Sequence, residues 1–423
     1  MKTVYICSEY FAPYQNIGSM KFSKITKILS RNNEYRIIVF SRKNFSNKVD
    51  CLLQDDLKEI ECNGGEVFFV DAGKKYYKSH TKLYNILYGI WHIVTGYNWN
   101  YYTSNIRSAK KFCRNALEII ENNHLPAPDY IISTYDDWGS HYLAMHLKKQ
   151  LGDKTVWISD FRDPVGAAVK KGIFRRLCDR YTYFVTENSD YTTVVSEGLL
   201  NCIEMYPETK TRIATNGFDY EDYERVLADK EKLHFVYTGS FYHQKRTLSP
   251  VFQAISELID EGKIEKKFIS IEYAGEYGAK VYNEVCKWGL EKCWLNWGEV
   301  TRYQSILLQE RGDVLMTSVW NLDDDQGVLG GKTLGYLMLK KPIIAIVSGT
   351  LGNSSMKKLV EETNCGICYE EAEHRVDYEK LKEQIMEYYI QKQTQGKVTQ
   401  KYSENVEKYN FESIAQIYAD IMS

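Results

Sequence analysis

The chain has 423 residues, of which 44% are hydrophobic and 26% are charged, and its formal net charge is −2 at pH 7. This length exceeds what one hydrophobic core usually fills, so we expect two domains. The composition excludes an intrinsically disordered chain, and the near-neutral charge gives no reason to expect a nucleic-acid partner.

Targeting and redox signals are weak. The apolar run at the N-terminus is too short for a signal peptide, and no run reaches the roughly 18 apolar residues of a membrane-spanning helix. The ten cysteines are scattered, which is typical of a reducing cytosol. Cys365 and Cys368 form a CGIC motif, but zinc would need two further ligands, so we interpret this segment as the start of a short buried strand.

Strand and helix patterns alternate in the first half of the chain. This alternation predicts a parallel sheet with helical crossovers, hence an α/β fold. The expected helix covers 19–30, and the expected strands cover 3–7, 35–40, 66–70, 130–133, 155–158 and 191–195.

A second such series begins at Leu233 and predicts a second parallel sheet. The polar, turn-rich stretch 202–232 between the two series is the expected hinge, and an apolar stripe predicts a last helix over 411–422. The expected strands of the second series cover 233–238, 269–274, 294–297, 314–318, 343–346 and 366–369, with a helix over 249–262.

A glycine-rich segment, QGVLGGKTLGYLMLKKP, follows the apolar strand that ends near Trp320 and opens a helix. Gly330 and Gly331 let backbone N–H groups approach an anion, and the helix N-terminus and Lys332 add positive charge. The segment therefore predicts a diphosphate site at the carboxyl edge of a parallel sheet. The alternative is a glycine-rich loop with a solvated lysine.

A second strand-to-helix loop carries a Lys–Arg pair. The strand LHFVYTGS ends at Gly239 and Ser240, and Lys245 and Arg246 precede the next helix. Lysine and arginine bind phosphate as a point charge and as a fork, so two such loops can neutralise one diphosphate. Ordinary surface charges are the alternative.

Polar residues also follow strands of the first domain. Gly18 lies in the loop after the first strand, where a side chain would obstruct a ligand. Asp160, Arg162 and Asp163 cluster in DFRDP after another strand, where a carboxylate could hold a sugar hydroxyl or accept its proton and the arginine could bind phosphate. Asp136 follows a third strand and could orient a sugar. The alternatives are an Arg–Asp pair that caps the strand end and an aspartate that forms a turn.

Nine segments in this order resemble the GT-B glycosyltransferases, most closely the family 4 retaining enzymes of bacterial surface polysaccharide synthesis. The more specific ones are DFRDP, VVSEGL and NGFD. The full set is VYICSEYFAPYQNIGSMKFSKITKILS, PDYIIST, ISDFRDP, NSDYTTVVSEGL, ATNGFD, FVYTGS, LNWGEVTRYQ, GGKTLGYLMLKKPI and YNFESIAQIYADIM.

The resemblance implies two Rossmann-like domains that face each other across a cleft. The first, 1–204, would bind the acceptor, and the second, 205–404, would bind the nucleotide sugar. The last helix, 405–423, would cross back to the first domain. Val300 in LNWGEVTRYQ would join the donor-binding residues.

The sequence departs from the family pattern at the donor loop. The resemblance implies two glutamates with seven residues between them, but Gly327 and Gly335 stand at these positions, with three aspartates at 323–325 just before. The arginine expected after the glycine of the GS strand is also missing, because Ser240 and Phe241 follow there. The chain therefore has fewer side chains that could bind the ribose and the phosphates than the family pattern has.

The resemblance implies a glycosyltransferase that needs no metal or other cofactor and works at the cytoplasmic face of the membrane, in capsule or other surface polysaccharide synthesis. Its partners would be a nucleotide sugar and a glycan or polyprenyl-diphosphate-linked acceptor. A degenerate GT-B protein that serves as a scaffold partner is the main alternative. A nucleotide-sugar epimerase is another, but the carboxylate and histidine array that it needs is not apparent.

One segment, 74–102, does not fit a plain Rossmann half. It combines an apolar stripe at helical spacing with tyrosines, tryptophans and several lysines at one end. Such a helix can lie in a membrane interface, which predicts peripheral membrane contact. The alternative is a helix packed on the domain.

Overall fold

The structure is a computed structural model, and the chain divides into two compact units. Unit 1 comprises Met1–Thr215 and Ile414–Ser423, and unit 2 comprises Asn216–Ser413. The structure describes residues 1–14, 17–43, 48–73, 99–135, 138–166, 173–202, 210–223, 231–241, 245–322, 329 and 331–423.

Unit 1 is built on a seven-stranded parallel sheet with the strand order β3-β2-β1-β4-β5-β6-β7. β1 is central to this order and pairs with two neighbours, so that Val4 lies opposite both Ile37 and Tyr130. The strands are β1 Lys2–Cys7, β2 Tyr35–Arg42, β3 Glu66–Val70, β4 Tyr130–Tyr135, β5 Val156–Phe161, β6 Tyr191–Val194 and β7 Lys210–Ile213.

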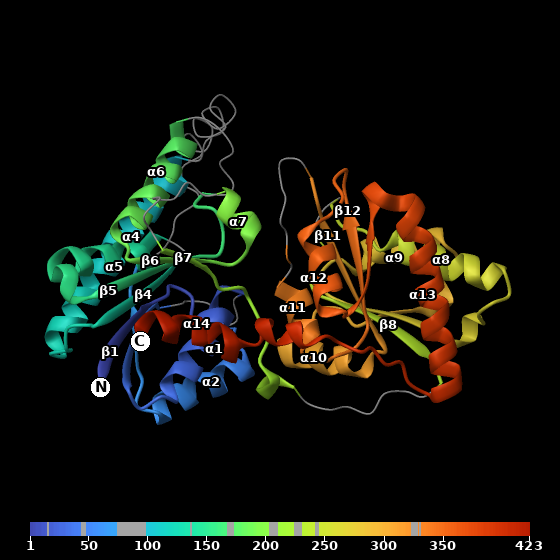
Figure 1. Ribbon diagram of the computed structural model, residues 1–423, viewed down its shortest axis with the longest axis horizontal. Helices are drawn as coiled ribbons and strands as arrows, with labels where there is room; N and C mark the ends of the chain where they lie inside the picture. The colour runs from blue at the N-terminus through green and yellow to red at the C-terminus, as the bar shows by residue number, and fades with distance from the viewer. Residues whose placement is uncertain are drawn as a thin grey trace, which may run out of the picture. The chain divides into compact units, whose positions relative to one another are not determined.

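Helices cover both faces of this sheet. In Figure 1, α1, α2 and α14 lie below the sheet, and α4, α5 and α6 lie above it. Burial on both faces explains why the strands are nearly continuous hydrophobic runs. The helices are α1 Ile17–Ser30, α2 Cys51–Cys62, α4 Trp99–Asn122, α5 Trp138–Leu151, α6 Ile173–Asn188, α7 Glu197–Cys202 and α14 Phe411–Met422.

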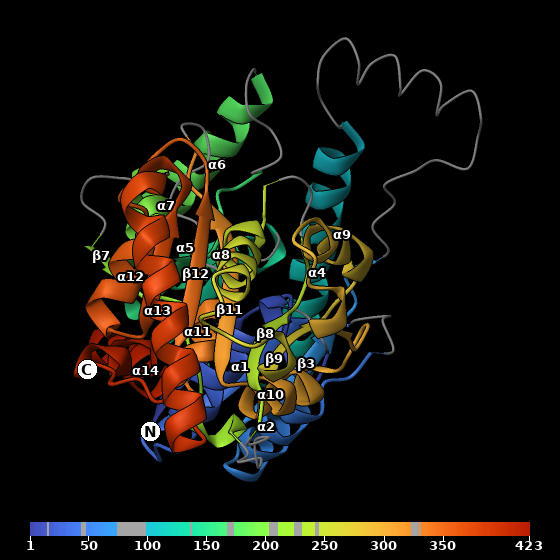
Figure 2. The same ribbon diagram turned by 90° about the vertical axis from the view of Figure 1, so that its right-hand side faces the viewer.

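Unit 2 repeats this architecture on a six-stranded parallel sheet with the order β10-β9-β8-β11-β12-β13. In Figure 2, β8, β9 and β11 of this sheet run side by side. The strands are β8 Leu233–Thr238, β9 Ile269–Ala274, β10 Trp294–Asn296, β11 Val314–Trp320, β12 Ile343–Ser348 and β13 Gly366–Glu370.

The helices of unit 2 also lie on both faces of its sheet. α10, α11 and α12 cover one face, and α8, α9 and α13 cover the other (Figure 1). α13 packs against α8 and β13, and its apolar side chains join those of β8 and β9 in one core. The helices are α8 Ser249–Asp260, α9 Gly278–Lys287, α10 Arg302–Arg311, α11 Gly331–Leu337, α12 Ser355–Thr363 and α13 His374–Gln395.

The expected two-sheet α/β fold is confirmed, and the strands lie within a few residues of their expected bounds. One strand was missed. β7, Lys210–Ile213, lies in the stretch expected to be a polar hinge, and it forms an exposed edge of the sheet. Its order comes from pairing with β6, which the polar pattern does not reveal. Cys365 and Cys368 are buried at the start of β13, and the described cysteines are free thiols.

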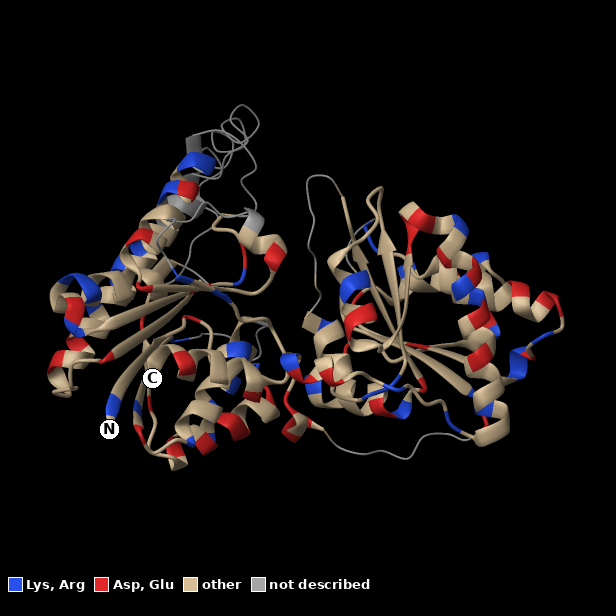
Figure 3. Ribbon diagram, viewed as in Figure 1, with Lys and Arg blue, Asp and Glu red and all other residues tan. Residues whose placement is uncertain are grey.

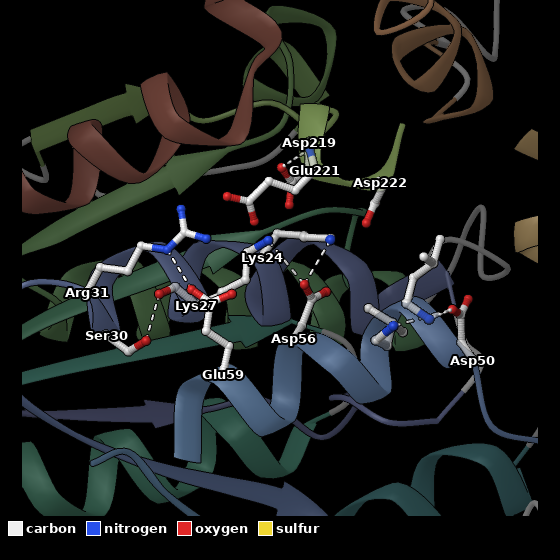
Figure 4. Close-up of polar contacts among 12 residues, drawn as sticks. Lys24, Lys27, Ser30, Arg31, Asp50, Asp56, Glu59, Asp219, Glu221 and Asp222 are labelled. Atoms are coloured by element: carbon white, nitrogen blue, oxygen red, sulfur yellow. Dashed lines mark hydrogen bonds and ion pairs between the residues drawn. The ribbon is translucent and has the colours of Figure 1, made fainter. Parts of the chain in front are cut away.

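Charged side chains contribute to the packing of unit 1. Lys24 and Lys27 on α1 both reach Oδ1 of Asp56 on α2, at 2.9 and 3.2 Å, and all three residues are buried (Figure 4). The side chain of Asp50 caps the N-terminus of α2 by accepting from the amides of Leu52 and Leu53. The two ion pairs join α2 to α1, and the cap satisfies amides at the start of α2.

The surface of the chain carries both signs of charge. Figure 3 shows lysine and arginine interspersed with aspartate and glutamate over the helices of both units. None of the helices that the structure describes is both long enough and apolar enough to cross a membrane. Most of the predicted membrane-contact segment, 74–98, lies outside the described residues, so that prediction has no structural test.

Candidate functional site

The sheet of unit 2 has its topological switch point between β8 and β11. From this pair the chain order runs outward on both sides, to β9 and β10 beyond β8 and to β12 and β13 beyond β11. The connections that leave β8 and β11 therefore lead to helices on opposite faces, α8 and α11 (Figure 1). Open α/β sheets bind ligands at the carboxyl ends of such a strand pair.

Lys332, in the first turn of α11, reaches across this point to β8. Its Nζ lies 3.7 Å from the ring centroid of Tyr237. Gly239 follows β8 with a φ of +109°, and a Cβ added there would lie 2.8 Å from Cε and 3.0 Å from Nζ of Lys332. The backbone angle favours a glycine, and a Cβ at this position would displace the end of the Lys332 side chain.

Lys245 and Arg246 approach the same switch point from the loop after β8. The Nζ of Lys245 lies 5.0 Å from the ring centroid of Trp320, the last residue of β11, and Cζ of Arg246 lies 5.4 Å from it. Nη1 of Arg246 donates to the carbonyl of Ser240 at 2.8 Å. Residues of both loops are therefore brought together around aromatic rings at the strand ends.

The electrostatics of this site favour an anion. Burial lowers the pKa of Lys332 well below its usual value, and the nearby positive charge of Arg246 lowers that pKa further. Among the described residues, no hydrogen bond or ion pair to the Nζ of Lys332 is formed. An anionic ligand would supply the counter-charge that this ammonium group lacks.

The remaining predicted donor-site residues are placed less closely. Gly331 begins α11, and a Cβ there would meet no atom within 4 Å. Gly330 lies outside the described residues. Val300 is half-buried and directly precedes Thr301, which caps α10. The structure therefore brings Gly239, Ser240, Lys245, Arg246 and Lys332 together.

Asp160, predicted to be catalytic, lies in a buried network of unit 1. Its Oδ1 accepts from Nζ of Lys21 at 2.7 Å, from Thr193 Oγ1 at 2.7 Å and from Tyr418 Oη at 2.9 Å. Its Oδ2 accepts from Thr134 Oγ1 at 3.1 Å. The residue is 0% exposed, so an acceptor sugar has no access to its carboxylate in this structure.

The other predicted residues of DFRDP lie nearer the surface. Arg162 is half-buried, and its Nη1 donates to the carbonyl of Gly18 at 2.5 Å. Burial lowers the pKa of Arg162 to about 10, while the charge of the exposed Asp163 opposes this. The structure thus joins Arg162 and Gly18, two predicted site residues from separate loops. Asp136 lies outside the described residues.

Sequence reasoning missed Glu9, at the switch point of unit 1 between β1 and β4. The carboxylate of this buried residue accepts from the amide of Gly139 at 2.6 Å and from Nη1 of Arg42 at 3.1 Å. A Cβ on Gly139 would lie 2.4 Å from Oε1 of Glu9. An internal carboxylate thus occupies the N-terminus of α5, a position that otherwise suits a ligand anion.

The two aromatic rings of the unit 2 site were also missed, although their positions carried a signal. Tyr237 is the penultimate residue of β8, and Trp320 is the last residue of β11. Side chains at the carboxyl ends of the two strands of a switch point border the ligand-binding crevice. An aromatic residue there can hold a neighbouring cation.

Each unit taken by itself lacks a metal-binding cluster among its described residues. Over the described ranges, neither unit alone brings three histidine, cysteine, aspartate or glutamate side chains close enough to share one ion. The aspartates at 323–325 lie outside those ranges. The lysine and arginine side chains at the unit 2 switch point can meet the charge of a diphosphate.

Comparison with known proteins gives matches in structure only. No protein-family model and no curated protein matches the sequence. Sucrose-phosphate synthase from Thermosynechococcus elongatus is similar in structure, with a TM-score of 0.61 and 14% identity over 100% of this chain and 99% of that one. A trehalose-6-phosphate protein from E. coli, bound with UDP-2-fluoro glucose, has a TM-score of 0.59 and 10% identity over 100% and 99%.

The apo form of the lipopolysaccharide outer core galactosyltransferase WaaB is a third match. Its TM-score is 0.56 at 10% identity, over 99% of this chain and 100% of that one. Both units are covered in all three comparisons, since almost the whole chain is aligned. At these identities the likeness shows the fold, and the chain has the GT-B fold with two Rossmann-like units.

Proposed function

We propose that this chain is a glycosyltransferase that moves a sugar from a nucleotide-sugar donor to a glycan or polyprenyl-diphosphate-linked acceptor. Surface polysaccharide synthesis at the cytoplasmic face of the membrane is the proposed setting, and the proposed stereochemical outcome is retention. The observation that carries the proposal is the placement of Lys332 on the Tyr237 ring beside Gly239, at the switch point of unit 2. Similarity in fold to a protein bound with UDP-2-fluoro glucose supports a nucleotide-sugar donor.

The chemistry requires a group that stabilises the departing diphosphate. As the bond from the anomeric carbon to the diphosphate oxygen lengthens, negative charge builds on the diphosphate and positive charge builds on the sugar. Lys332, Arg246 and Lys245 meet the diphosphate charge, and they do so most strongly when it is largest. Their location at a buried strand edge strengthens the interaction, because water screens it less.

We further propose that the reaction needs no metal ion, since the lysine and arginine side chains meet the diphosphate charge. Transfer should then continue in EDTA. If activity is lost in EDTA and restored by Mn²⁺ or Mg²⁺, metal independence is refuted. The assignment of the donor site would still stand.

In unit 1, the carbonyl of Gly18 holds Arg162 at the end of β5, where its guanidinium group can contact an acceptor phosphate or sugar. Asp163 is exposed beside it. Asp160 is assigned a positioning role instead, because its four hydrogen bonds hold the end of β5 in place. Asp136 is retained as a candidate for orienting the sugar.

One observation favours the alternative of a degenerate GT-B protein that binds without turnover. Gly335 on α11 stands where the resemblance implies a ribose-binding glutamate. A Cβ at Gly335 would meet no atom within 4 Å, so a side chain can begin there without a clash at its first carbon. The absence of this carboxylate is one of the departures from the family pattern, beside Gly327 and the missing arginine after Gly239.

The deciding experiment has two stages. A thermal-shift screen against UDP, GDP, ADP, CMP and their sugars identifies the donor, since a ligand of the native state raises the melting temperature. Release of the nucleoside diphosphate from that donor is then measured with Gly335→Glu beside the wild type. Turnover by the wild type supports the transferase. Binding without turnover by the wild type, with turnover gained in Gly335→Glu, supports the degenerate protein, and no binding at all contradicts both.

Epimerisation is separated in the same assay. An epimerase would convert the nucleotide sugar into its epimer without net release of the nucleoside diphosphate and without transfer of the sugar to an acceptor. Analysis of the sugar product by NMR distinguishes this outcome from transfer or slow hydrolysis.

A further inference from the structure

A third strand-to-helix connection of unit 2 also carries a lysine at the sheet edge. Lys280 lies in the first turn of α9, which follows β9, the neighbour of β8. The residue is half-buried, and its Nζ is fully covered and has no hydrogen-bond partner among the residues that the structure describes. Covering an ammonium group without a partner is costly, which calls for an explanation.

The position of Lys280 relates it to Lys332. Its Nζ lies 5.2 Å from the ring centroid of Phe241, which follows β8. The Phe241 ring makes an edge contact with Tyr237 at 5.6 Å between centroids, and Tyr237 carries Lys332. Two ammonium groups from the first turns of two different helices therefore lie on one pair of aromatic rings.

The loops after β8 and β9 are also joined through their backbones. The amide of Gly239 donates to the carbonyl of Ala274 at 2.7 Å, and a Cβ on Gly275 would lie 2.4 Å from the carbonyl oxygen of Gly239. The hydroxyl of Tyr273 donates to that same carbonyl at 3.2 Å. The start of α9 is thus held against the loop that borders the switch point, so Lys280 belongs to the same edge as Lys332.

The acidic residue of α9 is already engaged. Glu284, one turn along α9, accepts from the amide of Leu248 at 2.9 Å and from the hydroxyl of Thr247 at 3.0 Å. Burial raises the pKa of Glu284, and the charge of Lys280 lowers it in part. The two side chains do not form an ion pair within the part of the chain that the structure describes.

We infer that Lys280 is a further anion-binding residue of the unit 2 site, contributing to the grip on the diphosphate together with Lys332. This inference rests on the proposed function. A free nucleoside diphosphate carries one negative charge more than the same nucleotide with a sugar attached. An additional cation therefore favours the leaving group over the intact donor, which is the preference that speeds departure.

The chain offers a matched control on the same helix. Lys287 is also on α9, and its Nζ also lies over an aromatic ring, at 5.3 Å from the Trp288 centroid, but it is exposed at the helix end. Lys280→Met and Lys287→Met remove the same charge from the same helix. Only the first change affects the switch-point edge.

The experiment measures the affinities of UDP with UDP-glucose and of GDP with GDP-mannose by calorimetry, in Lys280→Met, Lys287→Met, Lys332→Met and wild type. We expect Lys280→Met to weaken the diphosphate about ten-fold and the sugar-linked form less. Lys287→Met should match the wild type.

The outcomes separate the inference from the proposed function. If no nucleotide binds to the wild type, the proposed function fails. If Lys332→Met loses affinity while Lys280→Met binds as the wild type does, the inference alone fails. A lower melting temperature with unchanged affinity in Lys280→Met would also overturn it, since that result assigns Lys280 to the support of Glu284. Lys280→Arg retains the charge and should restore most of the affinity.

Discussion

At the carboxyl edge of the unit 1 sheet, the carboxylate of Asp160 accepts four hydrogen bonds. The carboxylate of Glu9 accepts hydrogen bonds from Arg42 and from the amide of Gly139. At the corresponding edge of unit 2, Lys332 and Lys280 rest on aromatic rings. The charges of the first edge are neutralised within the protein, whereas those of the second lack an acidic partner among the described residues.

The difference teaches how to distinguish a structural charge from a binding one. A buried carboxylate with a full set of donors stabilises the strand end that carries it, and removing a partner is costly. An aromatic ring attracts a lysine ammonium group much more weakly than a carboxylate does. An ammonium group that lies on a ring therefore remains able to bind an anionic ligand. The same type of sheet edge thus holds a neutralised network in one unit and is the proposed anion site in the other.

The largest effect should come from breaking the unit 1 network. Asp160→Asn leaves the ammonium group of Lys21, 1% exposed, without its 2.7 Å partner. We expect a loss of about 3–5 kcal/mol in the free energy of unfolding, measured by urea denaturation. The exposed neighbour Asp163 provides the control, since Asp163→Asn should leave stability unchanged. A stable Asp160→Asn variant that binds donor and has lost transfer would instead place Asp160 in the reaction.

A paired charge away from the edge of unit 2 should behave as those in unit 1 do. Glu272 is buried, and hydrogen bonds from His234 and Trp297 and the charge of Arg311 outweigh the effect of burial, so the pKa of Glu272 falls from 4.5 to about 2. Since this pKa is lower in the folded state, the stabilisation exists above pH 4.5 and is lost as the pH falls towards 2.

Glu272→Gln should therefore cost roughly 2–3 kcal/mol at pH 7 and less at pH 3, as measured by denaturant titration at both values. An equal cost at the two pH values would show that charge is not the source of the stabilisation.

A smaller effect should follow from filling the space beside Lys332. Gly239→Ala places a Cβ within 3.0 Å of the Nζ of Lys332 and strains a φ of +109°. Gly262, in the same unit, has a φ of +68° and no atom within 4 Å of a Cβ, so Gly262→Ala carries the strain alone. Both variants should lose about 1 kcal/mol of stability. Only Gly239→Ala should also lose nucleoside diphosphate affinity, by about ten-fold in calorimetry, and equal affinity in the two variants would argue against the lysine's placement.

The pH dependence of binding sharpens the contrast further. The pKa of Lys332 is lowered by burial and by Arg246, so the free site loses its charge at a lower pH than an exposed lysine does. A bound diphosphate raises this pKa again. Binding should therefore take up a proton above the lowered pKa, and affinity should fall by up to about ten-fold per pH unit as the pH rises. Calorimetry in buffers of different ionisation enthalpy measures this uptake, which should disappear in Lys332→Met.

Much of the fold could be predicted from sequence because its strands are buried on both faces. Runs such as the one from Ile343 to Ile346 are apolar throughout, and the alternation with helices fixed the parallel topology. β7 could not be predicted in this way, because Lys210–Ile213 is polar and exposed and is ordered by pairing with β6.

Site residues could be predicted from sequence where their position in a loop after a strand was enough to place them. Lys245, Arg246 and Lys332 follow adjacent strands, so the parallel topology brings them together. Whether a side chain is buried and paired depends on contacts with residues far away in the sequence. For this reason the sequence predicted a catalytic role for Asp160, whereas the structure shows a buried carboxylate with internal partners. Its partner Lys21 is on α1, and its partner Tyr418 is in the last helix of the chain. No local pattern reports such a network.

The most direct measurement is the affinity of Lys332→Ala for a nucleoside diphosphate and for the corresponding nucleoside. Lys267 provides the control: its Nζ also lies on a ring, 4.7 Å from the Phe268 centroid, but it pairs with Glu265 at 2.7 Å. By calorimetry, Lys332→Ala should bind the diphosphate about ten- to a hundred-fold more weakly and the nucleoside unchanged, whereas Lys267→Ala should match the wild type. Equal diphosphate affinity in Lys332→Ala and wild type would contradict the assignment of the unit 2 edge as the diphosphate site.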